Sequence, residues 1–146
     1  MNWYLADIVL ENRIESDRRR VVHVNIILLK ARSAQLAFDK ATKIGRGYQI
    51  TYKNTVGKRV WVKFRGINQL TTVAEKLADG VELRYSEMVL TSEKKLKNLV
   101  SPKSKLAVFS KRRKPTESDP NYGPQEVFSK LLKMGFKKSD IYRATG

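Results

Sequence analysis

The chain has 146 residues, of which 41% are hydrophobic, so it can build one domain with a core and an appended segment but not two full domains. Lysine and arginine number 30 against 14 acidic residues, and the net charge is +16. Cysteine is absent, which excludes thiol catalysis, disulfides and cysteine-based zinc sites, and no segment reaches the roughly 18 apolar residues of a membrane-spanning helix.

The first two predicted strands surround a polar loop. Residues 3–11 alternate between apolar and polar positions, which predicts a strand buried mainly on one side. Residues 21–29 form a continuous apolar run rich in β-branched side chains, which predicts a central strand. Such a strand is expected to be covered on both faces, or on one face with a flanking element over part of the other. The loop between them ends in three cations that could bind phosphate or remain solvated: Arg18, Arg19 and Arg20.

A helix is expected directly after the second strand. Ser33 is a suitable N-cap, and the following alanines recur at helical spacing with Phe38 and Ile44, which predicts a helix over residues 34–44 with one apolar stripe. Gly45 and Gly47 are expected to end this helix.

The clearest hairpin in the chain joins residues 48–53 to residues 58–65 through Asn54-Thr55-Val56-Gly57. One parity is apolar, and the other carries four cations around a tryptophan, namely Lys53, Arg59, Trp61, Lys63 and Arg65. This second set predicts a face on which a base stacks and its phosphates are held. The alternative is that these residues are ordinary exposed strand positions that protect a sheet edge.

The last elements of the core are predicted from weaker patterns. Apolar residues between 66 and 79 favour a short helix ended by Gly80, and residues 81–90 favour a final strand. The predicted order is therefore β-β-α-β-β-α-β, an α+β fold with an antiparallel sheet of about five strands and helices on one face.

Several short motifs carry a resemblance to a known family. They are Trp3-Tyr4-Leu5-Ala6, Val22-His23-Val24-Asn25, the alanine-rich helix over 34–44, Phe64-Arg65-Gly66 and Glu82-Leu83. With these motifs the chain resembles the bacterial family catalogued as domain of unknown function 4288, over residues 1–90. The resemblance implies a compact α+β domain of bacterial type and brings no catalytic residues with it.

The remaining residues, 91–146, are expected to form a basic extension. They hold 14 cations and 5 acids, a net charge of +9, whereas residues 1–90 hold 16 and 9, a net charge of +7. A linker is predicted over residues 110–123 and terminal helices over 124–144. The cluster Lys111, Arg112, Arg113 and Lys114 is either an anchor for a polyanion or a solvated tether. The terminal helices are expected to dock on the chain's own domain, on a second copy or on another protein, through Phe128, Leu132 and Phe136.

No catalytic residue, metal site or cofactor is predicted. His23 is the single histidine and lies within a predicted strand, where a packed side chain is favoured over a general base. The acids Asp7, Glu11, Glu82 and Glu87 are too scattered in spacing to indicate a metal site.

The charge therefore predicts the function. We expect a cytoplasmic, non-catalytic protein that contacts nucleic acid through phosphates and does not associate with a membrane. One alternative is a protein-interaction module, for example an adaptor or immunity-type subunit, in which the terminal helices assemble an oligomer or bind a partner. A second alternative is a nuclease-like enzyme, which requires carboxylates that converge in the folded chain.

Overall fold

The computed structural model describes residues 1–111 and 113–124. The chain divides into two compact units. The first contains residues 1–84 and the segment that begins at Pro120, and the second contains residues 85–119. The two units are described in turn.

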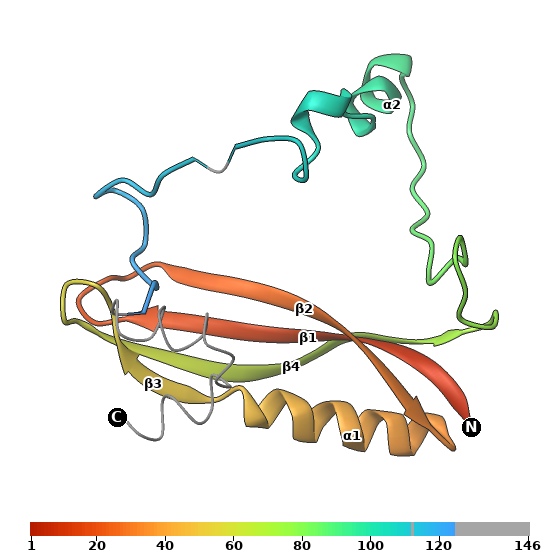
Figure 1. Cartoon of the computed structure of the whole chain (residues 1–146), viewed down its shortest axis with the longest axis horizontal. Helices are drawn as coiled ribbons and strands as arrows, with labels where there is room; N and C mark the ends of the chain where they lie inside the picture. Colours follow the sequence, from red (N-terminus) through yellow and green to blue (C-terminus); the bar gives the residue numbers. More distant parts are fainter. Residues whose placement is uncertain (112, 125–146) are drawn as a thin grey trace. The chain divides into compact units, whose positions relative to one another are not determined.

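The first unit is built on a four-stranded antiparallel sheet in the order β2-β1-β4-β3 (Figure 1). Its strands are β1 (Asn2–Ile14), β2 (Arg20–Ala31), β3 (Ile50–Lys53) and β4 (Arg59–Val73). Two hairpins supply the pairs β1–β2 and β3–β4, and β4 then pairs with almost the whole of β1. The two interior strands of the sheet are therefore β1 and β4, and the edges are β2 and β3.

The prediction that residues 21–29 form the central strand is wrong. They belong to β2, which is an edge strand with β1 as its neighbour. Of its apolar residues, those at even positions are exposed by 41–58%, namely Val22, Val24, Ile26 and Leu28. The reason is that β1 pairs with β2 along one of its edges and with the 15-residue β4 along the other. β2 therefore has a strand neighbour on one side only among the described residues.

One face of the sheet is covered by the helix α1 (Ala34–Gly47), which contacts β1, β2 and β4. The predicted N-cap is confirmed, because Ser33 Oγ accepts a hydrogen bond from the Leu36 amide at 3.2 Å. Ala37 and Ala41 are fully buried in the core, and their small side chains let the helix lie close to the sheet. This core also contains Tyr4, Ala6, Ile8 and Leu10 of β1.

Gly45 lies inside α1 and does not end it, contrary to the prediction. A Cβ at this position would lie 2.5 Å from Cδ2 of Phe64, so the absent side chain admits the Phe64 ring of β4. The last residue of the helix is Gly47, and Tyr48 caps it, with its amide bonded back to Gly45 O at 3.1 Å. The glycine therefore serves packing between helix and sheet.

The second half of the predicted core differs from the structure. In place of the short helix in residues 66–79, β4 continues to Val73. Its pairing with β1 shifts register twice, around Gly66, which has a φ of 136°. These shifts change which residues share a face, and the spacing of apolar residues then imitates a helix. Residues 81–90 form no strand, so the sheet has four strands rather than five while the α+β class is confirmed.

The β3–β4 hairpin is confirmed, with a positive φ of 82° at Gly57. The segment 121–124 returns to this hairpin, although residues 121–123 were expected as linker and Pro124 as the start of the terminal helices. Asn54 Nδ2 donates to Asn121 O at 3.0 Å, Asn54 forms a β-bridge with Pro124, and the Tyr52 hydroxyl donates to Tyr122 O. Asn54 is fully buried, so its side chain joins the hairpin to this segment.

The second unit contains the short helix α2 (Glu93–Leu99) and the 3-10 turn η1 (Lys103–Lys105), neither of which was predicted. Neither element has a buried residue. None of the helices in the described part of the chain is long and apolar enough to cross a membrane. The predicted helices over 124–144, with Phe128, Leu132 and Phe136, lie outside the described residues apart from Pro124.

Candidate nucleic-acid interface

The face of the sheet opposite α1, hereafter the open face, carries the cations that the strands bring together. Residues directly opposite one another on neighbouring strands point to the same face. Because the even-numbered residues Tyr4 to Leu10 of β1 pack with α1, the odd-numbered residues of β1 up to Arg13 point to the open face.

Four strands contribute one row of side chains to this face. Arg13 of β1 lies opposite Arg20 of β2 and Trp61 of β4, and Trp61 lies opposite Thr51 of β3. Lys63 lies beside Glu11 one row further on, and Lys53 pairs with Arg59. We call this group the cationic end of the open face: Arg13, Arg20, Lys53, Arg59, Trp61, Lys63 and Arg65.

Trp61 is the aromatic residue of the cationic end. Its side chain is 40% exposed, whereas the neighbouring Val60 is fully buried, as the strand alternation predicted. Arg59 lies over the indole, with Cζ 5.9 Å from the ring centroid. An exposed indole next to a guanidinium can stack with a further planar group, such as a nucleic-acid base.

Glu11 is a buried acid that organises part of the cationic end. Its carboxylate is 3.2 Å from Nε of Arg20 and 3.8 Å from Nη1 of Arg65, while its own side chain is only 8% exposed. The two arginines remain 63% and 49% exposed. Glu11 therefore positions two guanidinium groups on the open face and offsets part of their charge.

Arg13 is a member of the cationic end that sequence reasoning missed. Its Nε is buried and has no hydrogen-bond partner among the described residues. Arg13 continues the odd-numbered series Asp7, Val9 and Glu11 of β1. That series could have identified Arg13 as a residue of the same face. The prediction placed the end of the strand at Glu11 and assigned Arg13 to the loop.

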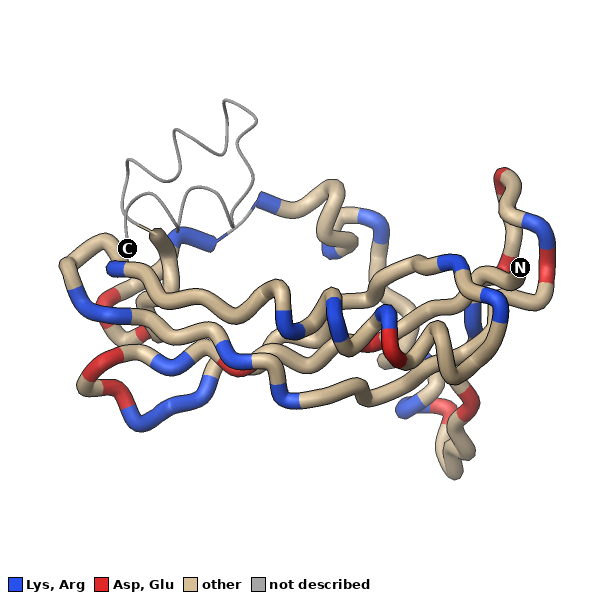
Figure 2. The backbone as a smooth tube through the Cα atoms, turned by 90° about the horizontal axis from the view of Figure 1, so that it is seen from below, with Lys and Arg blue, Asp and Glu red and all other residues tan. Residues whose placement is uncertain are grey.

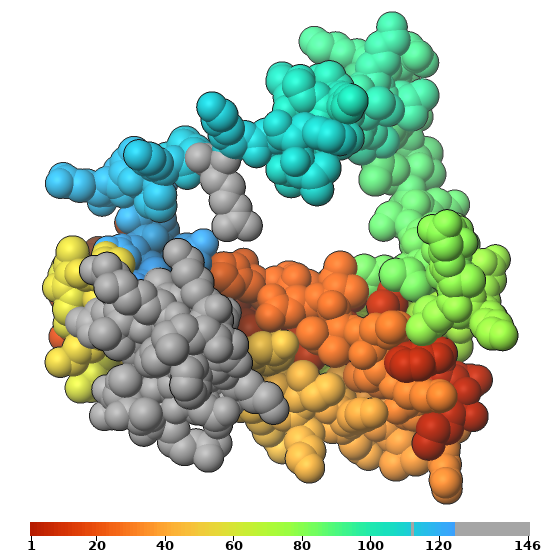
Figure 3. Space-filling view, viewed as in Figure 1, coloured from red at the N-terminus to blue at the C-terminus, as the bar shows by residue number. Residues whose placement is uncertain are grey.

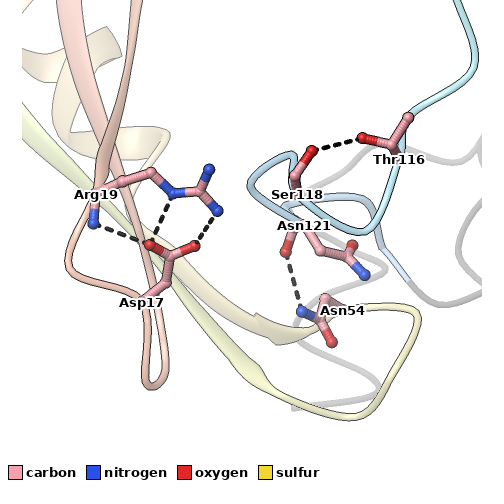
Figure 4. Close-up of polar contacts among 6 residues, drawn as sticks. All are labelled: Asp17, Arg19, Asn54, Thr116, Ser118 and Asn121. Carbon is pink, nitrogen blue, oxygen red and sulfur yellow. Dashed lines mark hydrogen bonds and ion pairs between the residues drawn. The ribbon is translucent and has the colours of Figure 1, made fainter.

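The arginine triplet of the β1–β2 loop does not act as one group. Arg20 lies on the open face, whereas Arg19 is held by Asp17 through bonds of 3.0 and 2.8 Å from Nε and Nη2 (Figure 4). These hydrogen bonds lower the pKa of Asp17 from 3.8 to about 2. Arg18 is exposed within the loop. The loop thus presents Arg18 and an arginine that already has a carboxylate partner.

The basic cluster of the extension belongs to the second unit. Arg113 bonds both carboxylate oxygens of Asp119, at 3.0 and 3.1 Å, and this pair lowers the pKa of Asp119 to about 2. Lys111 and Lys114 are exposed, and Arg112 lies outside the described residues. Lysines and arginines occur in both units, so the positive charge is not confined to the extension (Figure 2).

The remaining titratable residues form no catalytic arrangement among the residues described. Asp7 is buried and pairs with Arg84 at 2.5 Å, and this hydrogen bond raises the pKa of Arg84. Nδ1 of His23 is 3.5 Å from Asn12 Nδ2, and the imidazole meets the Tyr122 ring edge-on at 5.2 Å. No group of three or more metal-binding side chains converges within residues 1–111 and 113–124.

Comparison with known proteins gives one match, to a protein family, over part of the chain. A family model described as "Domain of unknown function (DUF4288)" matches residues 3–86. No curated protein and no solved structure matches the chain. The matched range includes the whole cationic end of the open face.

Proposed function

The chain belongs to the DUF4288 family, and we propose that it is a non-catalytic protein that binds nucleic acid through its phosphates. The observation that carries this proposal is the cationic end of the open face, where cations from all four strands surround an exposed tryptophan. The family description names no activity. A cytoplasmic location, expected from the absence of cysteine, stays a prediction.

The spacing of the side chains suits a single strand of nucleic acid. Arg59, Trp61 and Lys63 are alternate residues of β4, and alternate residues of a strand are separated by about 6.8 Å along its axis. A base can stack on Trp61 only if it is free of its own base pair, whereas the flanking cations bind phosphates of any sequence. We therefore expect binding that is strongly salt-dependent and weakly sequence-dependent.

Salt titration with matched variants tests this proposal. A fluorescently labelled single-stranded oligonucleotide is titrated with the full chain at several salt concentrations. Each phosphate contact contributes about 0.7 to the slope of log K against log salt, so Arg59→Gln/Lys63→Gln should reduce the slope by about 1.4. The control Lys43→Gln/Arg46→Gln removes the same charge from exposed positions of α1, on the opposite face, and should leave the slope unchanged.

Trp61 provides a separate test of stacking. Trp61→Ala should weaken binding by about 1–3 kcal/mol, roughly 5- to 150-fold, without changing the salt slope, because the indole has no charge. Trp61→Phe should retain most of the affinity. Binding that does not depend on salt, or an equal loss in the α1 control, would contradict the proposal.

The two alternatives have less support. The protein-interaction alternative as predicted depends on Phe128, Leu132 and Phe136, which lie outside the described residues, so it stays a prediction. The nuclease-like alternative needs convergent carboxylates, whereas Asp7 and Glu11 each have arginine partners.

A further inference from the structure

The free edge of β2 is a second surface that can bind a partner. β2 has 12 residues and pairs with β1 along its length, while its other side has no strand neighbour in the described part of the chain. Every second N–H and C=O of an edge strand points away from the sheet and can pair with another strand. One of these positions is capped, because Lys40 Nζ donates to Lys30 O at 3.1 Å. The opposite edge of the sheet, β3, has only four residues.

Along residues 21–29, this edge lacks the charged residues, prolines and β-bulges that normally prevent the addition of another strand. Residues 21–29 contain no charged residue, proline or glycine, and their pairing with β1 has no register shift. The exposed residues Val22, Val24, Ile26 and Leu28 form an apolar stripe on the open face, beside the free edge. Atoms of β2, in orange, lie at the molecular surface in Figure 3. The edge therefore offers unpaired backbone groups together with alternate apolar contacts.

The charges at both ends of β2 select the occupant. Arg20 begins the strand and Lys30 lies next to its last residue. If a second copy paired antiparallel with Ile26 opposite Val24, Arg20 of each copy would lie opposite Lys30 of the other. That arrangement sets cation against cation between two chains that each carry a net charge of +16. An acidic strand instead gains a favourable charge pair at each end.

We infer that the β2 edge accepts an extended strand from an acidic protein partner. The partner strand has apolar residues at alternate positions opposite Val24, Ile26 and their neighbours, and an acidic residue opposite Arg20 and Lys30. Backbone hydrogen bonds to the edge provide affinity, and the alternate side chains and terminal charges provide selectivity. Arg20 belongs to both surfaces. The tests of nucleic-acid binding change Arg59, Trp61 and Lys63 of β4, whereas the tests of strand pairing change Val24 and Ile26 of β2, so the failure of either proposal can be distinguished from the failure of the other.

The probe is a synthetic peptide of 11 residues, with glutamate at both ends and alternating isoleucine and threonine between them. Binding to the full chain is measured by fluorescence anisotropy. We expect Val24→Gln/Ile26→Gln to weaken binding by at least about tenfold. The control Leu36→Gln/Phe38→Gln changes apolar residues of similar exposure, 51% and 47% against 48% and 58%, on α1, and should bind the peptide as the parent chain does.

Two further peptides separate strand pairing from simple attraction of charges. A peptide with lysine in place of both glutamates should bind at least about tenfold more weakly. A peptide with the same charges and a central proline, which lacks a backbone donor, should also bind at least about tenfold more weakly. Equal binding of either peptide, or no binding of the original one, would overturn the inference.

Hydrogen exchange on the unaltered chain gives a readout that does not depend on any variant folding. The outward amides of β2 should exchange rapidly in the free chain and slowly after the acidic peptide is added. Slow exchange in the free monomer would show that the edge is already paired, which overturns the inference. A dimer in sedimentation experiments that Val24→Gln/Ile26→Gln dissociates would make a second copy the occupant, which also overturns it.

Discussion

At the scale of single residues, Gly45 and Gly47 are two positions apart in α1 and have different surroundings. An added Cβ at Gly45 would overlap the Phe64 ring, whereas nothing lies within 4 Å of the corresponding position at Gly47. Both glycines were interpreted from sequence as helix-ending signals. A glycine required for close packing and one near a helix end look alike in a sequence, because the contact that distinguishes them comes from a distant strand.

This difference predicts opposite effects on stability. Gly45→Ala should lower the free energy of unfolding by about 1–3 kcal/mol, because the Phe64 ring must move. Gly47→Ala should raise it by up to about 1 kcal/mol, because alanine loses less backbone entropy than glycine in a helix. Urea unfolding measures both.

The double variant Gly45→Ala/Phe64→Leu checks the cause. It should lose less stability than the two single changes added together, because a smaller side chain at position 64 leaves room for the alanine. Strict additivity would show that the ring is not responsible.

At the scale of elements, the β3–β4 hairpin and the segment 121–124 depend on Asn54. Its Oδ1 accepts hydrogen bonds from the amides of Val56 and Lys58, at 3.1 and 2.8 Å, which orders the turn. Its Nδ2 donates to Asn121 O, which holds the returning segment. The hairpin was predicted from local residues, but the return of residues 121–124 was not, because its bonds join positions about 67 residues apart in the sequence.

The turn therefore offers a matched pair of substitutions. Asn54→Ala should destabilise the chain by about 2–3 kcal/mol, because it removes the acceptor of the Val56 and Lys58 amides and the donor to Asn121 O from a fully buried position. Asn121→Ala should cost less than about 1 kcal/mol, because it removes only an exposed bond to Thr55 Oγ1 and keeps the backbone oxygen that Asn54 uses. Equal losses in thermal unfolding would contradict this role for Asn54.

At the scale of the whole molecule, positive charge is the dominant physical property. The net charge of +16 favours binding to polyanions, but the cations also repel one another in the folded chain. Some are paired internally, as Arg84 is with Asp7 and Arg113 with Asp119. These pairs leave the net charge of +16 unchanged, but they engage individual arginines within the chain.

Self-repulsion predicts how stability responds to salt. Raising sodium chloride from low to physiological concentration should raise the melting temperature by roughly 3 °C for each kcal/mol of screened repulsion. The variant Lys43→Glu/Lys76→Glu lowers the net charge by four at two exposed positions and should show a smaller rise. A rise of the same size in both proteins would mean that salt acts through something other than screening.

Sequence alone determined the features whose causes lie within a few residues. The Ser33 cap, the two hairpins, the alternation that buries Val60 beside an exposed Trp61, and the α+β class all follow from local spacing. Tertiary structure decided which strands are interior, how far β4 extends, and that Arg13 joins Arg20 and Trp61 on one face. It also decided that the outer side of β2 has no strand neighbour among the described residues. The physical reason is that these outcomes depend on the length and register of a partner strand far away in the chain, and the register shifts around Gly66 change the facing of the residues that follow.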